Sequence, residues 1–216
     1  MSSDGLLLLL PWRDTLRRLP QVVLGLWLFG VGIAAMVAAD LGLPPWDVFH
    51  QGVAQTVGVS LGTVIIATGV VLVLAFIPLK APLGLGTILN AVLIGISVDT
   101  TLLWLPSDGE LWLRIVLCAS GPAIVGLASG LYLGGGLGPG PRDGLMTGIG
   151  RRGFTIWKVR TGIELTVLVL GILLGGSLGF GTAWFAISIG PFVQLFLRRF
   201  TKRAAGASTP EEPPRS

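Results

Sequence analysis

Uncharged apolar runs long enough to cross a bilayer constrain the fold more than any other feature of this 216-residue sequence. A helix needs about 20 apolar residues to cross the hydrocarbon core. The sequence predicts an all-α polytopic membrane protein with about six transmembrane helices, and five is the alternative because the third and sixth spans are short. The runs are Gln21–Ala39, Val59–Leu79, Ala81–Val98, Ile115–Leu133 and Leu165–Leu197, the last divided in two by glycines between positions 175 and 181.

The composition agrees with a membrane-embedded chain and excludes several other classes of protein. Only 12% of the residues are charged, against about 25% in an ordinary soluble domain, and the mean hydropathy is +0.82. A soluble enzyme and a nucleic-acid-binding module are both excluded, because a chain this small cannot hide so much apolar surface. The single cysteine, Cys118, excludes a disulfide framework and a cysteine-based metal site. With neither a Walker motif nor a Ser-His-Asp set, we expect no enzymatic activity, no cofactor and no metal.

Basic residues set the predicted orientation. Lys and Arg precede the first span, follow the sixth and occupy the second and fourth connections, and Arg114 alone falls on the other side. Because cytoplasmic loops carry the excess of Lys and Arg, both termini are predicted to be cytoplasmic. Residues 1–19 form a cytoplasmic N-terminal segment, residues 20–200 the transmembrane domain and residues 201–216 a disordered cytoplasmic tail in this interpretation.

Two halves of the chain share motifs in the same order. At an offset of 96, the Leu-Gly-x-x-Pro-x-Asp string that ends at Asp47 recurs at Asp143, and at an offset of 95 Gly84-x-Gly-Thr87 recurs as Gly179-x-Gly-Thr182. Repeat one covers about 21–102 and repeat two about 117–197. Each repeat would hold three spans, an odd number, so the second would be inverted in the membrane relative to the first.

Each repeat also contains a Pro/Gly-interrupted segment, Leu41–Gly58 or Leu137–Gly153. About ten to fourteen residues suit either a re-entrant half-helix or a helix lying flat at the interface. Inverted repeats with interrupted helices at corresponding positions are typical of transporters, whose site lies between the repeats. The sequence favours a small-solute transporter or permease, with a non-transporting membrane scaffold or regulatory protein as the alternative. The expected partners are the lipid bilayer and an unknown small solute or ion, with no nucleic acid, and a homo-oligomer is left open.

Ionisable residues inside membrane segments are costly and are therefore candidates for the solute or ion pathway. Asp47 and Asp143 each follow a proline at a predicted helix start, where a carboxylate either caps the helix and complements its dipole or binds a proton or cation. His50, the only histidine, lies three residues after Asp47 and shares its helical face. Asn90 is the interior polar candidate of the third span.

Two arginines complete the candidate set. Arg142 is adjacent to Asp143 and can pair with it, or can form an anion site with Arg160. Arg160 and Glu164 are four residues apart, which predicts an ion pair that faces the bundle interior. Trp46, Trp104 and Trp112 are expected in an outer interfacial belt.

The same segments resemble the YczE/YitT-type family of bacterial integral membrane proteins, and the YczE branch in particular. The resemblance extends over nearly the whole chain. It implies a bacterial plasma-membrane location, and it implies no activity, substrate or catalytic residue. The motifs that carry it are Gly42-x-x-Pro45-Trp46-Asp47-Val48-Phe49-His50-Gln51-Gly52, Gly86-Thr87, Gly140-Pro141-Arg142-Asp143-Gly144-Leu145-Met146 and Arg160-x-x-x-Glu164.

Overall fold

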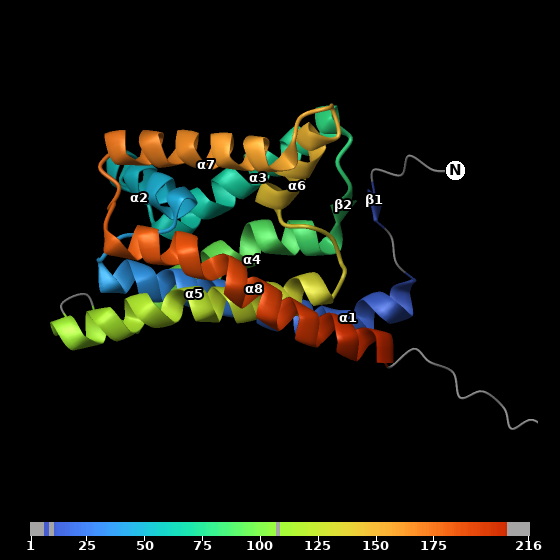
Figure 1. The fold of residues 1–216 in the computed structure, drawn as a ribbon, viewed down its shortest axis with the longest axis horizontal. Helices are drawn as coiled ribbons and strands as arrows, with labels where there is room; N and C mark the ends of the chain where they lie inside the picture. The colour runs from blue at the N-terminus through green and yellow to red at the C-terminus, as the bar shows by residue number, and fades with distance from the viewer. Residues whose placement is uncertain (1–6, 9–10, 107–108, 207–216) are drawn as a thin grey trace, which may run out of the picture.

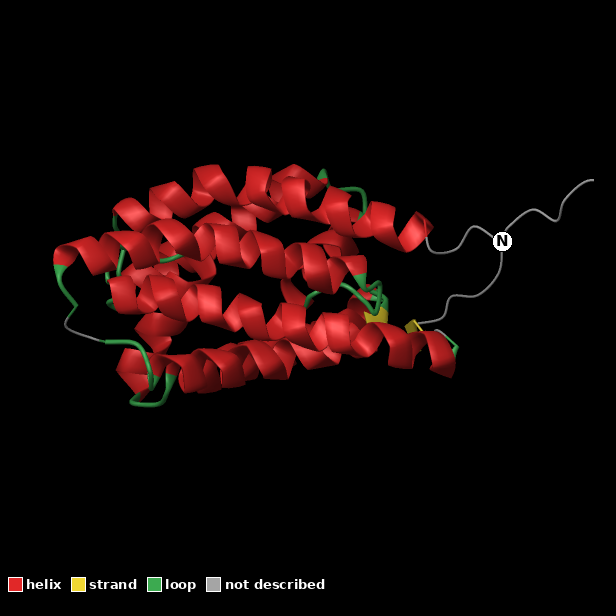
Figure 2. Cartoon of the chain, turned by 90° about the horizontal axis from the view of Figure 1, so that it is seen from below, coloured by secondary structure: helices red, strands yellow, loops and turns green. Residues whose placement is uncertain are grey.

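The computed structural model describes residues 7–8, 11–106 and 109–206, which form a bundle of eight helices (Figure 1). A two-residue parallel ladder joins β1 (Leu7–Leu8) to β2 (Leu83–Gly84). The longer helices run roughly along the long axis of the bundle (Figure 2). The helices are α1 Trp12–Ala39, α2 Pro45–Val57, α3 Leu61–Leu79, α4 Leu85–Leu102, α5 Leu111–Gly134, α6 Pro141–Gly150, α7 Ile156–Leu173 and α8 Phe180–Gly206.

Among the described residues, five helices are long and apolar enough to cross a membrane: α1, α3, α4, α5 and the Phe180–Phe200 part of α8. The prediction of an all-α polytopic membrane protein is therefore confirmed. The remaining long helix, α7, has 18 residues but carries Lys158, Arg160 and Glu164. These charges make its apolar stretch shorter than in the other five.

Three helix boundaries differ from the sequence prediction, because charged residues do not stop a helix. The fifth predicted span begins at Ile156 instead of Leu165. α1 begins at Trp12, within the predicted N-terminal segment, and α8 continues to Gly206, within the predicted disordered tail. The rest of that tail, residues 207–216, lies outside the described residues.

Helices α1 and α5 form the centre of the bundle and approach each other closely. A Cβ added at Gly25 would lie 2.8 Å from the backbone nitrogen of Tyr132, and one at Gly32 would lie 2.7 Å from a methyl carbon of Val125. Glycine at such positions lets helix backbones come close together. α4 packs against α1 and α8 against α5, on either side of this centre.

The two short helices lie within the bundle rather than flat against it. α2 packs between α7 and α3, and α6 packs mainly on α3. Both begin with a proline at the first helical position, Pro45 or Pro141, where the missing N–H costs nothing and the fixed φ favours a helix. The face of α2 that carries Asp47, Val48 and His50 is almost completely buried. That burial argues against the interfacial interpretation for α2.

Candidate functional site

A buried group of charged and aromatic side chains forms where the N-terminal ends of α2 and α6 come together. On α2, His50 Nδ1 lies 3.1 Å from Asp47 Oδ1, and both side chains are 1% exposed. On α6, Arg142 Nη2 lies 3.4 Å from the same carboxylate oxygen and 3.5 Å from His50 Nδ1. An ionised carboxylate only accepts hydrogen bonds, so His50 donates Nδ1–H to Asp47, and in the neutral imidazole Nε2 is then an acceptor. Histidine and arginine thus share one carboxylate across the two halves of the chain.

Neither aspartate caps its helix. The N-cap residues are Pro44 for α2 and Gly140 for α6, and neither helix has a side-chain cap. Asp47 and Asp143 instead lie in the first helical turn, where a negative charge complements the helix dipole. The capping part of the structural interpretation is therefore wrong, whereas the position of both aspartates agrees with its helix-dipole part.

Asp143 contacts a residue of α5 instead of the adjacent Arg142 that the sequence suggested as its partner. Its Oδ2 accepts a hydrogen bond from the hydroxyl of Tyr132 on α5, at 3.3 Å. Arg142 contacts Asp47 of the other half instead of its neighbour Asp143. The half-buried Asn90 of α4 lies beside the start of α6, because a Cβ added at Gly140 would be 3.2 Å from its Nδ2. Tyr132, the only tyrosine of the chain, was not among the residues singled out from the sequence.

Trp46 does not lie in the interfacial belt that the sequence predicted for it. Its side chain is 7% exposed, whereas Trp104 and Trp112 are exposed as an interfacial belt requires. The Arg142 guanidinium lies over the Trp46 ring, 5.0 Å from its centroid, a favourable cation–π arrangement. Two buried nitrogens in this group have no hydrogen-bond partner: Trp46 Nε1 and His50 Nε2. Leaving a buried polar group unpaired costs about 1–3 kcal/mol, so each needs an explanation.

Arg160 and Glu164 form the predicted ion pair, with Arg160 Nε donating to Glu164 Oε1 at 3.0 Å. The pair does not face the bundle interior, since Arg160 is 57% and Glu164 32% exposed. Arg160 therefore lies apart from the Asp47 group, on the outer surface of α7.

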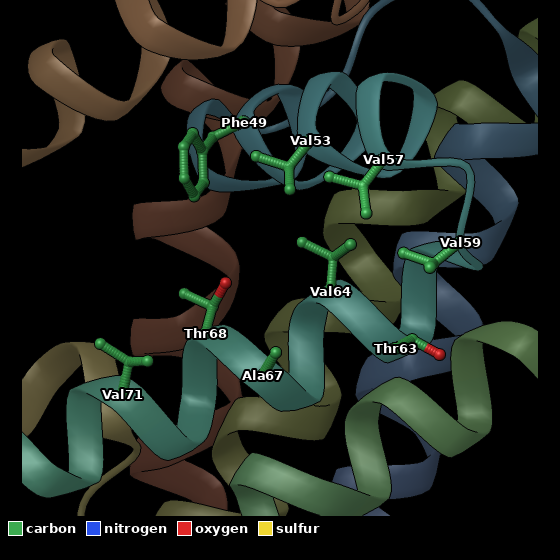
Figure 3. Close-up of a pocket in the computed structure, with 9 residues that line it drawn as sticks. All are labelled: Phe49, Val53, Val57, Val59, Thr63, Val64, Ala67, Thr68 and Val71. Atoms are coloured by element: carbon green, nitrogen blue, oxygen red, sulfur yellow. The ribbon is translucent and has the colours of Figure 1, made fainter.

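Two hollows of the described structure are apolar and open, and neither contains the charged group. One, of about 480 Å³, lies between α2 and α3 and is lined mainly by valines (Figure 3). The other lies between α6 and α7, at the corresponding place in the second half, and includes Ile149, Val159 and Val167. In the Asp47 group, Asp47 and His50 are buried and Arg142 is partly exposed, and the described residues contain no cluster of His, Cys, Asp or Glu suited to a metal.

Comparisons with known proteins give a consistent picture. Residues 16–198 match a family of unknown function, DUF6198. The chain is 38% identical to an uncharacterized protein of Haemophilus influenzae, over 86% of each chain. It is 35% identical to the uncharacterized membrane protein YczE of Bacillus subtilis, over 80% of this chain and 82% of that protein. No solved structure matches the chain.

Proposed function

We propose that this chain, which belongs to the DUF6198 family and is a YczE-like membrane protein, is a small-solute transporter with its site between two inverted repeats. The main support is the buried contact between Asp47 of the first half and Arg142 of the second, at the ends of two interrupted helices. Ionisable groups at membrane depth are expensive and cluster on solute and ion pathways. Interrupted helices whose N-termini meet inside the protein are the arrangement that transporters use for such sites.

Reciprocal contacts between the halves support the inverted repeat. The backbone nitrogen of Gly86 donates to the carbonyl of Leu137 at 2.8 Å, and Gly181 donates to Leu41 at 2.7 Å. The Gly-x-Gly-Thr motif of each half thus binds the Leu-Gly loop of the other half. This exchange is what a two-fold relation between the repeats would produce.

Two arginines make a second pair of reciprocal contacts between the halves, at the ends of the central helices α1 and α5. Arg114 of α5 donates to the carbonyl of Ala39 at the end of α1, at 2.7 Å. Arg18 of α1 donates to the carbonyl of Gly135 at the end of α5, at 3.4 Å. Donors and acceptors are both related by the offset of 96, and a cation at a helix C-terminus is stabilising.

The orientation of the helices supports six spans. α1 begins and α8 ends at the same end of the bundle, while the turns from α4 to α5 and from α7 to α8 lie at the other end (Figure 1). α7 is then the sixth spanning helix, despite its charges. With the basic termini inside, this arrangement follows the positive-inside rule.

One pair of helices breaks the symmetry, and this difference suggests motion. In the first half Ser60 Oγ donates to Asp99 Oδ2 at 2.6 Å and the backbone of Gly62 donates to Asp99 Oδ1 at 2.7 Å, which fastens α3 to α4. The residues 95 positions later are Thr155 and Gln194.

The corresponding second-half helices, α7 and α8, hardly touch. Thr155 makes no side-chain cap bond, and Gln194 is exposed. A Cβ added at Gly162 or Gly190 would meet no atom within 4 Å. Closure of α7 onto α8, with release of α3 from α4, would exchange the conformations of the two halves and alternate access to the site.

Cysteine cross-linking tests this alternation without knowledge of the solute. In a Cys118→Ser background, the pair Thr155→Cys with Gln194→Cys is expected to form an intramolecular disulfide over minutes, because α7 visits α8. The matched first-half pair, Ser60→Cys with Asp99→Cys, is expected to react at once. Monomer mobility on gels and peptide mass separate intramolecular from intermolecular products.

Gly190→Leu provides the control for the second-half pair. A leucine there would block closure, whereas a Cβ at this position meets no atom within 4 Å in the present conformation, so the variant should abolish the Thr155–Gln194 cross-link and leave the melting temperature unchanged. If Thr155→Cys with Gln194→Cys never cross-links although each cysteine reacts with maleimide, the gap is permanent. The non-transporting scaffold would then be the better interpretation.

A further inference from the structure

The group around Arg142 has a second property, which concerns what it binds. Its guanidinium uses one of five N–H donors on a protein carboxylate, at 3.4 Å, whereas charge-assisted hydrogen bonds are typically about 2.7–2.9 Å. The guanidinium is 27% exposed and lies on the Trp46 ring. A planar fork that is held in place but weakly bonded is suited to receive a second planar acceptor.

The unpaired atoms of the two residues that contact the guanidinium, Trp46 and His50, specify the ligand further. Trp46 Nε1 is a donor only, it is buried, and it lacks an acceptor. His50 Nε2, with its ring 6.3 Å from that of Trp46, is buried and lacks a donor. A ligand that relieves both must present acceptor oxygens and, close to them, a hydrogen-bond donor.

The surrounding charges limit the ligand to a single negative charge. Arg142 is the only cation that contacts this group in the described structure, and it already faces Asp47, with Asp143 next to it in sequence. Two helix N-terminal ends add partial positive charge. A dianion such as phosphate would bring two charges against one shared cation, whereas a monocarboxylate brings one.

We propose that Arg142, Trp46 and His50 form the binding site for a small monocarboxylate with a neighbouring hydroxyl group, such as a 2-hydroxy acid. The carboxylate oxygens accept from Arg142 and from Trp46 Nε1–H, and the hydroxyl donates to His50 Nε2. This assignment rests on the proposed transport function and adds the class of solute to it.

Binding to the full-length chain in lipid nanodiscs tests the assignment through the ligand-dependent rise in melting temperature. Four probes separate the chemistry: glycolate, acetate without the hydroxyl, glycolamide without the charge, and chloride without the paired oxygens. We expect glycolate to bind about three- to tenfold more tightly than acetate, as one hydrogen bond provides. Glycolamide and chloride should cause no shift at the same concentration.

Trp46→Phe is the decisive variant, because phenylalanine keeps a ring under the guanidinium and removes only the unpaired N–H. It should weaken glycolate binding about three- to tenfold without lowering the melting temperature of the unliganded protein. Arg142→Lys keeps the charge but loses the fork, and should weaken binding more than about tenfold.

Three results would overturn the assignment. They are equal stabilisation by chloride or glycolamide, glycolate affinity that is unchanged in Trp46→Phe, and no stabilisation by glycolate at all. The cysteine pairs test the transport proposal separately, since cross-linking of α7 to α8 does not depend on the ligand class. Glycolate binding without cross-linking would leave the site in place and remove the transport proposal.

Discussion

The contact between Asp47 and Arg142 predicts that replacing Arg142 lowers the stability of the protein more than replacing Asp47 does. Arg142→Gln leaves the Asp47 carboxylate, 1% exposed, without its cation. Loss of one partner from a buried ion pair costs about 3–5 kcal/mol. We expect about 3 kcal/mol, at the lower end, because His50 still donates to the same carboxylate.

The reverse substitution should cost less. Asp47→Asn leaves a guanidinium that is 27% exposed and that keeps its contact with the Trp46 ring. Since a partly exposed cation is hydrated and needs its partner less, we expect about 1–2 kcal/mol. In the double variant neither charge is left without its partner, so the two losses should not add, and a coupling energy of about 1–2 kcal/mol should appear.

Reversible unfolding in mixed SDS micelles, followed by circular dichroism, measures these differences. Arg142→Lys is the control, since it retains the cation and should lose less than Arg142→Gln. The reasoning is refuted if Asp47→Asn is as destabilising as Arg142→Gln, or if the double variant equals the sum of the single losses within about 0.5 kcal/mol.

Two further predictions use other parts of the bundle. In a Cys118→Ser background, Leu103→Cys should react with an impermeant maleimide added outside intact cells and Arg151→Cys should not. The opposite labelling would show that the chain has the reverse orientation in the membrane. Arg114→Gln loses contacts at 2.7–3.3 Å and should lower stability by about 1–2 kcal/mol, whereas Arg18→Gln loses a single bond at 3.4 Å and should cost under about 1 kcal/mol by the same unfolding assay.

Local sequence signals were sufficient for the helices and for contacts within one helix. Of the six spans predicted from apolar runs, five correspond to described helices that are long and apolar enough to cross a membrane, and the prolines at positions 45 and 141 marked the start of α2 and α6. The spacing of three residues also predicted that Asp47 and His50 share a face, and they are hydrogen-bonded. Such contacts follow from helix geometry alone.

The contacts between the halves could not be predicted in the same way. Arg142 is adjacent to Asp143 in sequence, yet α6 directs it toward Asp47, 95 residues away. A tryptophan is amphipathic and suits either an interface or a buried cation–π contact, so Trp46 was assigned to the wrong environment. The repeated motif did identify both interrupted segments, but its matching residues say nothing of which side chains meet.

The charges of α7 link the number of membrane spans to a measurable energy. Glu164 lies near the middle of the 18-residue helix and pairs with Arg160 on its exposed face. In water such a pair is worth about 0.3–0.5 kcal/mol. Near the centre of a bilayer, a charge left by its partner costs about 2.5–3.5 kcal/mol on insertion scales.

Arg160→Leu therefore separates six spans from five. If α7 spans the membrane, the unpaired Glu164 should reduce the fraction of chains in which a cysteine introduced by Leu178→Cys, at the exposed turn before α8, is labelled from outside. Adding Glu164→Leu should restore that fraction, because no charge then remains in the pair. If α7 lies in water, neither change should alter insertion by more than the small worth of a surface pair. Absence of outside labelling in the parent and in both variants would thus favour five spans, because four spans before Leu178 leave it on the cytoplasmic side, and would place the α7 charges at the membrane surface.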